Sequence, residues 1–182
     1  CFLQKIQNDV VIVSETEDSV TIRKNSDGDF KVLMFTDMHL KGDKELDKIT
    51  ISHMINNITQ QQPDLVILGG DNVTYGFNKK RNVQLAELFE NLGVYWATVL
   101  GNHEGDGFMS YDRANVIKLF SSYEHCLVKE GKEGVDGNGN FGDDAKNYDI
   151  HIEGIADDNT KCIKVFIGEI LPAGLGETEL KL

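Results

Sequence analysis

The chain has 182 residues and a mass of 20.3 kDa, a size that suits one domain. About 40% of the residues are hydrophobic and 26% are charged, which is enough apolar material for a sizeable core and excludes disorder as the main state. Lys and Arg number 18 against 30 Asp and Glu, so the net charge is −12. Such a charge argues against non-specific binding to nucleic acid or to an anionic membrane. The apolar runs are far shorter than the roughly 18 residues that a membrane-spanning helix needs.

The three cysteines, Cys1, Cys126 and Cys162, have a spacing typical of neither a zinc site nor a disulfide framework. We expect buried thiols at one or two of these positions. The chain begins with Cys1 and not with Met. A lipoprotein-type cleavage in a secreted protein leaves such a cysteine, and so does trimming of a longer chain, so the localisation stays open.

The N-terminal segment has the pattern of β-strands. Val10–Val13 and Ser19–Arg23 are predicted strands, the second because apolar and polar residues alternate in it. Turn-forming residues at 25–29 predict a hairpin over Val20–Phe35. Its second arm, Lys31–Phe35, is mostly apolar, as expected at the centre of a covered sheet.

Helices and strands alternate through the middle of the chain. Apolar residues at helical spacing predict three helices, listed here with their inward residues: Leu46, Ile49, Met54, Ile55 and Ile58; Val83, Leu85, Ala86, Leu88, Phe89 and Leu92, capped by Gly93; and Ala114, Ile117 and Phe120 within Tyr111–Ser121. Asp64–Leu68 and Val94–Leu100 are the predicted strands between them. A repeat of roughly 30 residues suits right-handed βαβ units and a parallel sheet.

Beyond residue 122 the pattern changes to short strands joined by polar loops. The predicted strands are Cys126–Lys129, Asn147–Glu153 and Cys162–Gly168. Gly131–Asp144 is rich in glycine and is predicted to be a mobile surface loop. Ile170–Leu182 has no clear periodicity and is expected to be a tail or part of an interrupted domain.

Three clusters of polar side chains follow the three predicted parallel strands. They are Asp37-Met38-His39, Gly70-Asp71-Asn72 and Gly101-Asn102-His103-Glu104. The carboxyl ends of strands in an open α/β sheet form the crevice where ligands bind. Three such clusters in this order, each after a strand, are therefore much stronger evidence for a site than any one of them.

The residue types in these clusters suit divalent metal ions. Asp37 and His39 are two residues apart, so on an extended backbone their side chains point the same way. Asp71 has two carboxylate oxygens and can bridge two ions, and Asn102 offers an amide oxygen. His103 points elsewhere and is free to transfer protons.

The stretches FTDMHL, GGDN and GNHEG resemble the motifs of the calcineurin-like metallophosphoesterase superfamily, and the resemblance covers about residues 30–152. Within it, the chain is most similar to small purple-acid-like phosphatases whose GNHE block opens a Gly-rich insertion. Purple acid phosphatases carry a Tyr three residues after the aspartate of the GD motif. Thr74 occupies that position here, which argues against a purple Fe(III)–tyrosinate site.

The resemblance implies an α/β fold, the α/β/β/α sandwich of that superfamily, in a single domain over residues 1–182. It also implies two divalent ions of the Mn, Fe, Zn or Co class. Asp37 and His39 would hold the first, Asp71 would bridge, and Asn102 would hold the second. The implied reaction is phosphoester hydrolysis by a hydroxide that the two metals bridge, with His103 stabilising or protonating the leaving oxygen.

The family completes its metal site with later histidines, including a Gly-His-x-His sequence that this chain lacks. After His103 the sequence has only His125 and His151. Because Tyr148, Ile150 and Ile152 form the predicted buried stripe of their strand, we expect His151 to face outward. His125 and His53 are expected on the surface. The domain is therefore expected to lack its C-terminal third, and the second metal site to lack ligands.

Two functions remain open at this stage. One is a metal-dependent phosphatase or phosphodiesterase that acts on a phosphorylated small molecule or a phosphoprotein. The other is a truncated or non-catalytic domain of the same fold that acts as a binding module. A nuclease is disfavoured because the chain is acidic and has no basic stripe. The sequence leaves the oligomeric state open.

Overall fold

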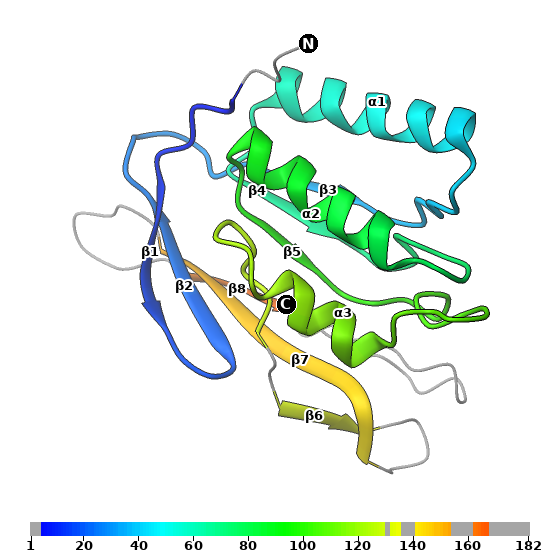
Figure 1. Cartoon of the computed structure of the whole chain (residues 1–182). Coiled ribbons are helices and arrows are strands. Elements are labelled where there is room, and N and C mark those ends of the chain that lie inside the picture. Colours follow the sequence, from blue (N-terminus) through cyan, green and yellow to red (C-terminus); the bar gives the residue numbers. More distant parts are fainter. Residues whose placement is uncertain (1–4, 130–131, 136–140, 154–161, 168–182) are drawn as a thin grey trace.

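The computed structural model describes residues 5–129, 132–135, 141–153 and 162–167. In this part of the chain, strands form two sheets and helices cover the smaller one (Figure 1). The predictions for Cys1 and for Ile170–Leu182 lie outside the described residues. The α/β class is confirmed. The described helices form one outer layer, and a second helical layer is not among the described residues.

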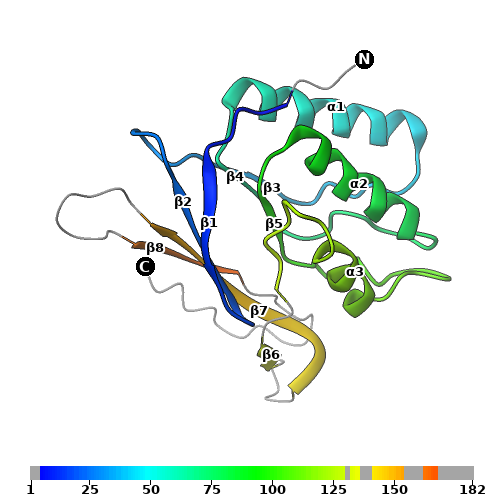
Figure 2. The same ribbon diagram turned by 60° about the vertical axis from the view of Figure 1, so that its left-hand side comes forward.

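The smaller sheet is parallel, in the order β3 (Val32–Phe35), β4 (Leu65–Leu68) and β5 (Trp96–Thr98). Helix α1 (Lys44–Gln61) connects β3 to β4, and α2 (Lys79–Leu92) connects β4 to β5. The three strands follow one another in both sequence and space. Because crossovers between parallel strands are right-handed, both helices lie on the same face of the sheet. Figures 1 and 2 show α1 and α2 together on the face of this sheet that is turned away from the other sheet.

Local signals set the ends of these helices. The Asp43 side chain caps α1 by accepting hydrogen bonds from the backbone N–H groups of Glu45 and Leu46, both at 3.1 Å. Gly93 ends α2 in the left-handed conformation that the sequence predicts for it. No helix in the described residues is both long and apolar enough to cross a lipid bilayer.

The larger sheet has β7 (Phe141–Glu153) at its centre. The first half of β7 pairs with β6 (Lys132–Val135). Its second half lies between β2 (Ser19–Lys24), which is parallel to it, and β8 (Cys162–Ile167), which is antiparallel. Strand β1 (Val10–Glu15) forms a hairpin with β2 at the sheet edge.

The predicted hairpin over Val20–Phe35 is wrong. Strand β2 pairs with β1 and β7, whereas β3 belongs to the other sheet, so the turn residues at 25–29 carry the chain from one sheet to the other. Asp64 fixes this crossing, because its Oδ2 accepts from Lys31 N–H at 2.7 Å and from Lys24 Nζ at 3.1 Å. Alternation of residues predicts a strand but not its partner.

Aromatic packing and one hydroxyl group join the layers. Trp96 is fully buried. Its ring stacks on that of Phe89 of α2, with 4.9 Å between ring centroids, and packs edge to face with Phe120 of α3 (Arg113–Phe120), with 5.0 Å between ring centroids. The hydroxyl of Tyr148 on β7 donates to the Thr98 carbonyl at 2.8 Å and accepts from the Thr98 N–H at 3.1 Å. Tyr148 thereby ties the larger sheet to the last residue of β5.

Other sequence predictions need correction. The predicted loop Gly131–Asp144 contains β6 and the start of β7. Cys126–Lys129 makes a single bridge from Cys126 to Trp96 and no strand. Leu46, Ile49 and Ala114 are exposed, because each helix turns only part of its apolar stripe inward. The buried residues of α3 are Val116, Ile117 and Phe120, so Ile117 and Phe120 face inward as predicted.

Candidate metal centre

The loops that follow β3 and β4 run side by side beyond the ends of the strands. Asp37 N–H donates to the Gly70 carbonyl at 3.0 Å, and His39 N–H donates to the Asp71 carbonyl at 2.9 Å. Leu40 then forms an isolated parallel bridge with Val73. The backbone pairing of the sheet thus continues into the loops and fixes the two polar clusters relative to each other.

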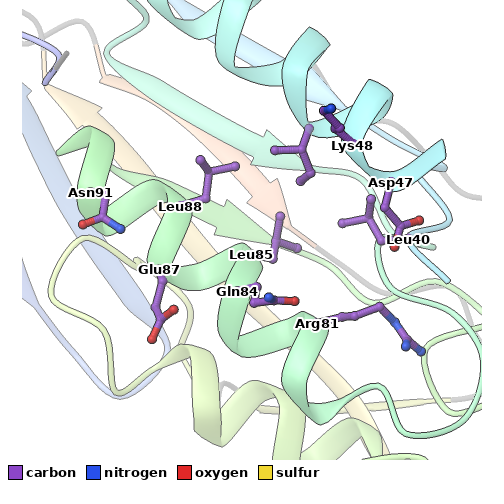
Figure 3. Close-up of a pocket in the computed structure, with 10 residues that line it drawn as sticks. Leu40, Asp47, Lys48, Arg81, Gln84, Leu85, Glu87, Leu88 and Asn91 are labelled. Carbon is purple, nitrogen blue, oxygen red and sulfur yellow. The ribbon is translucent and has the colours of Figure 1, made fainter. Parts of the chain in front are cut away.

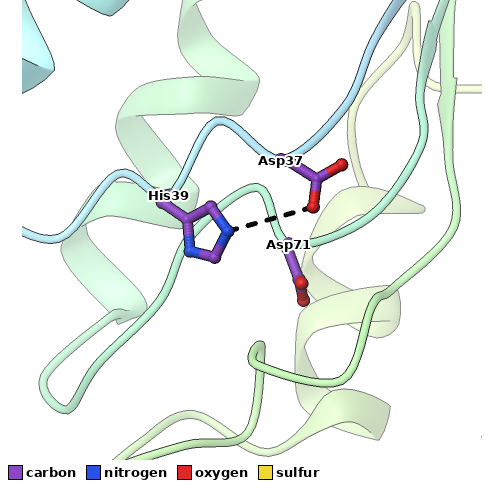
Figure 4. Close-up of side chains that lie close together, drawn as sticks. All are labelled: Asp37, His39 and Asp71. Carbon is purple, nitrogen blue, oxygen red and sulfur yellow. Dashed lines mark ion pairs between the residues drawn. The ribbon is translucent and has the colours of Figure 1, made fainter.

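Asp37, His39 and Asp71 bring one potential ligand atom each to within 4.8 Å of the others (Figure 4). His39 Nε2 lies 3.9 Å from Asp37 Oδ1. Asp37 and His39 are exposed, whereas Asp71 is 8% exposed at the base of the group. A site that is open on one side and anchored on the other can take an ion from solvent. This is the one such group of His, Cys, Asp or Glu side chains in the described part of the chain.

The convergence of Asp37 and His39 has a different origin from the one predicted. An extended backbone is predicted to turn both side chains the same way, but Asp37 (φ 54°), His39 (φ 47°) and Asp71 (φ 49°) are all in the left-handed region. Non-glycine residues seldom adopt it, although Asp and His do so more often than most. Such backbone strain persists where the surroundings hold it and is concentrated at functional sites. Here the paired backbones of the two loops hold it.

Close packing against the loop after β5 fixes the Asp71 side chain. Its Oδ1 accepts a hydrogen bond from the backbone N–H of His103 at 2.8 Å. A Cβ at Gly101 would collide with the Asp71 carboxylate, and Gly70 has φ 100° and packs against the Gly101 backbone. Both glycines therefore allow the loop after β4 and the loop after β5 to meet at Asp71.

The His103 side chain lies beside the ligand group. Its ring centroid is 5.8 Å from that of His39, and its Nδ1 is 2.6 Å from Asp106 Oδ2. The hydrogen bond to Asp106 raises the pKa of His103 above its ordinary value, and the charge of Asp71 adds to the effect. A raised pKa favours the protonated imidazole, which is the form that can act as a general acid.

Glu104 is a buried residue of the site for which we predicted no role. It is 1% exposed, and its Oε1 accepts from the Asn72 backbone N–H at 2.6 Å. Burial raises the pKa of Glu104 to about 7, opposed by the hydrogen bond from Asn72 and increased by the charge of Asp71. The available signal was its place in the Gly101-Asn102-His103-Glu104 cluster, but a sequence does not reveal burial at one position.

The other predicted residues lie as follows. Asn102 is exposed, next to His103. Tyr148, Ile150 and Ile152 are buried, so the predicted stripe is confirmed, and His151 alternates with them.

Two further histidines lie apart from the ligand group. His53 is exposed on α1, as predicted. His125 is half-buried, because its Nδ1 pairs with Glu90 of α2 at 2.8 Å. His125 is thus only partly exposed at the surface, and it packs the chain after α3 against α2.

A cavity of about 380 Å³ lies between α1 and α2 (Figure 3). None of the three ligand residues lines it. Two of its charged side chains are engaged by backbone, since Asp47 accepts from Gly42 N–H at 2.8 Å and Arg81 donates to the Gly76 carbonyl at 2.9 Å. We assign this cavity no part in the chemistry.

The chain has sequence similarity to a known protein family and to known proteins. The family model described as calcineurin-like phosphoesterase matches residues 30–168. The chain is 29% identical over 157 residues to "Probable inactive purple acid phosphatase 14" of Arabidopsis thaliana, covering 73% of this chain and 37% of that protein. It is 26% identical over 157 residues to "Probable inactive purple acid phosphatase 29" of the same plant, covering 75% and 38%. The matches thus span less than two-fifths of these relatives' lengths, and no solved structure matches. Because the family model covers most of the chain, the chain belongs to the calcineurin-like phosphoesterase family.

Proposed function

We propose that this chain is a metal-dependent phosphoester hydrolase domain in which Asp37, His39 and Asp71 hold a divalent ion. The observation that carries the proposal is the approach of their ligand atoms to within 4.8 Å at the carboxyl ends of β3 and β4. Two carboxylates and an imidazole are a suitable donor set for Mn, Fe, Zn or Co ions. The second carboxylate oxygen of Asp71 and the amide oxygen of Asn102 would take part in holding a second ion.

The protein residues have separate tasks in this proposal. Bound divalent ions would supply a nucleophilic hydroxide at neutral pH and neutralise charge on the phosphoryl oxygens. His103 would donate the proton from its imidazole to the leaving oxygen, and Asp106 would orient the ring by accepting at Nδ1. Asp71 is positioned by the His103 backbone N–H, so the ligand and the acid share one hydrogen-bonded unit. Substrates would be phosphorylated small molecules or phosphoproteins.

A non-catalytic domain of the same fold is the second candidate. It is favoured by the names of the two relatives, both of which contain the word "inactive". In this case the chain would bind one ion or a phosphorylated partner without turnover.

One paired experiment separates the candidates. The chelator-treated protein is reconstituted with Mn²⁺, its metal content is measured, and hydrolysis of 4-nitrophenyl phosphate is followed. Bound metal with a turnover that Asp71→Asn abolishes supports the hydrolase. Bound metal without turnover supports the non-catalytic domain. A chain that binds no metal contradicts the proposed centre.

A further inference from the structure

We propose that four exposed apolar side chains form a platform that binds the aromatic group of a phosphoester whose phosphate lies at the metal centre. The platform consists of Tyr75, Phe77, Phe108 and Met109, each between 63% and 77% exposed. Phe77 and Phe108 contact each other edge to face at 6.1 Å. This inference rests on the proposed function for the position of the phosphate.

The platform lies on the loops that carry the candidate site. Tyr75 is four residues after Asp71, and Phe108 is five residues after His103. Chain geometry limits the first separation to about 14 Å and the second to about 18 Å between Cα atoms. Both loops lie side by side at the same end of the smaller sheet in Figure 1. A ligand anchored at the ligand group can therefore extend its ester group over these rings.

The backbone beneath the platform is strained. Tyr75 (φ 67°), Phe77 (φ 56°) and Met109 (φ 54°) adopt the left-handed conformation, which is an outlier for residues of this size. The strain holds these three large side chains mostly in solvent, where they gain little burial for the fold. Strain maintained without a gain in packing is characteristic of a binding surface.

Hydrogen bonds from Arg81 and Asn78 hold the strained loops in place. Arg81 Nη2 donates to the carbonyls of Thr74, Tyr75 and Gly76 at 3.0, 3.2 and 2.9 Å. Asn78 is fully buried and joins the two loops, because its Nδ2 donates to the Glu104 carbonyl at 2.8 Å and its Oδ1 accepts from Tyr111 N–H at 2.7 Å.

Close backbone contact between the loops completes the unit. A Cβ at Gly76 would collide with the Phe108 carbonyl, and Gly107, at φ 95°, packs against Gly76. The platform is thus preformed before any ligand arrives, which reduces the conformational entropy that binding costs.

The chemistry of the surface selects the occupant. Aromatic rings in an edge-to-face pair leave ring surface free for another aromatic group. All four platform residues are uncharged, so the platform itself offers no charged partner to a second ionic group on the ligand. The substrate class that fits is an aryl phosphomonoester, with one phosphate and an apolar ring.

The test is titration calorimetry of the Mn²⁺-reconstituted protein with 1-naphthylmethylphosphonate, which has no ester bond to hydrolyse, and with inorganic phosphate. We expect the naphthyl compound to bind about tenfold more tightly. The double variant Phe77→Ser, Phe108→Ser should lose that preference and keep its affinity for phosphate. The matched control Leu46→Ser, Ile49→Ser removes two exposed apolar side chains of α1 and should keep both affinities.

Other outcomes overturn the platform or the proposed function separately. Equal affinity for both ligands in the wild type, or an unchanged preference in the platform variant, overturns the platform. If neither ligand binds, the proposed function fails, and saturation-transfer NMR with 1-naphthol tests the platform alone. A signal that is lost in the platform variant then supports the platform, whereas equal signals, or none, overturn it.

Discussion

Replacement of the buried carboxyl of Glu104 by an amide should remove a pH dependence of stability. In the folded chain the pKa of Glu104 is raised to about 7 from an ordinary value of 4.5. The folded state therefore binds the proton more tightly than the unfolded state does, and stability falls as pH rises between these two values. At 1.36 kcal/mol per pKa unit, the loss is about 3 kcal/mol across this range.

The assay is urea denaturation in the presence of a chelator from pH 5 to pH 8, for wild type and for Glu104→Gln. Gln can still accept from Asn72 N–H, so the two proteins should have similar stability at pH 5. At pH 8 the variant should gain about 3 kcal/mol relative to wild type. The control Glu17→Gln changes an exposed carboxyl in the β1–β2 turn and should follow the wild type. If the free energies of unfolding of wild type and Glu104→Gln changed with pH in the same way, the reasoning would be refuted.

Three further predictions concern packing, the ligand group and the proton donor. Tyr148→Phe removes the hydroxyl that joins the sheets and should lower the free energy of unfolding by about 1–2 kcal/mol in urea denaturation, and no change would contradict that role. Gly101→Ala should displace the Asp71 carboxylate and weaken Mn²⁺ binding at least about tenfold by calorimetry. The added Cβ of Gly105→Ala makes only ordinary van der Waals contacts, so that variant should bind Mn²⁺ as tightly as wild type. His103→Gln keeps the backbone N–H and should lower 4-nitrophenyl phosphate turnover about 10²–10⁴-fold at unchanged Mn²⁺ content. Loss of metal in that variant would instead make His103 a ligand.

The sequence was sufficient to predict the parallel sheet and the polar clusters at its carboxyl edge. Buried strands and amphipathic helices have distinct periods, and the βαβ connection has one hand, so the order of elements determines which strand ends meet. Asp37, His39 and Asp71 therefore come together as expected.

Features that depend on distant contacts could not be predicted in the same way. The left-handed conformation of Asp37 and His39 arises from pairing with the loop after β4, about 30 residues away in sequence. The pairing of β2 with β7 joins residues more than 100 positions apart, whereas a nearby turn suggested a local hairpin. The burial of Glu104 likewise depends on its packing against Asn72.

The central claim, that Asp37, His39 and Asp71 hold a divalent ion, is tested most directly by Mn²⁺ titration calorimetry of the chelator-treated protein. The wild type should bind Mn²⁺, and Asp37→Asn and Asp71→Asn should each bind at least about tenfold more weakly. The control Asp27→Asn, in an exposed turn, should bind as wild type. Wild-type affinity in Asp71→Asn, or no Mn²⁺ binding by the wild type, would contradict the claim.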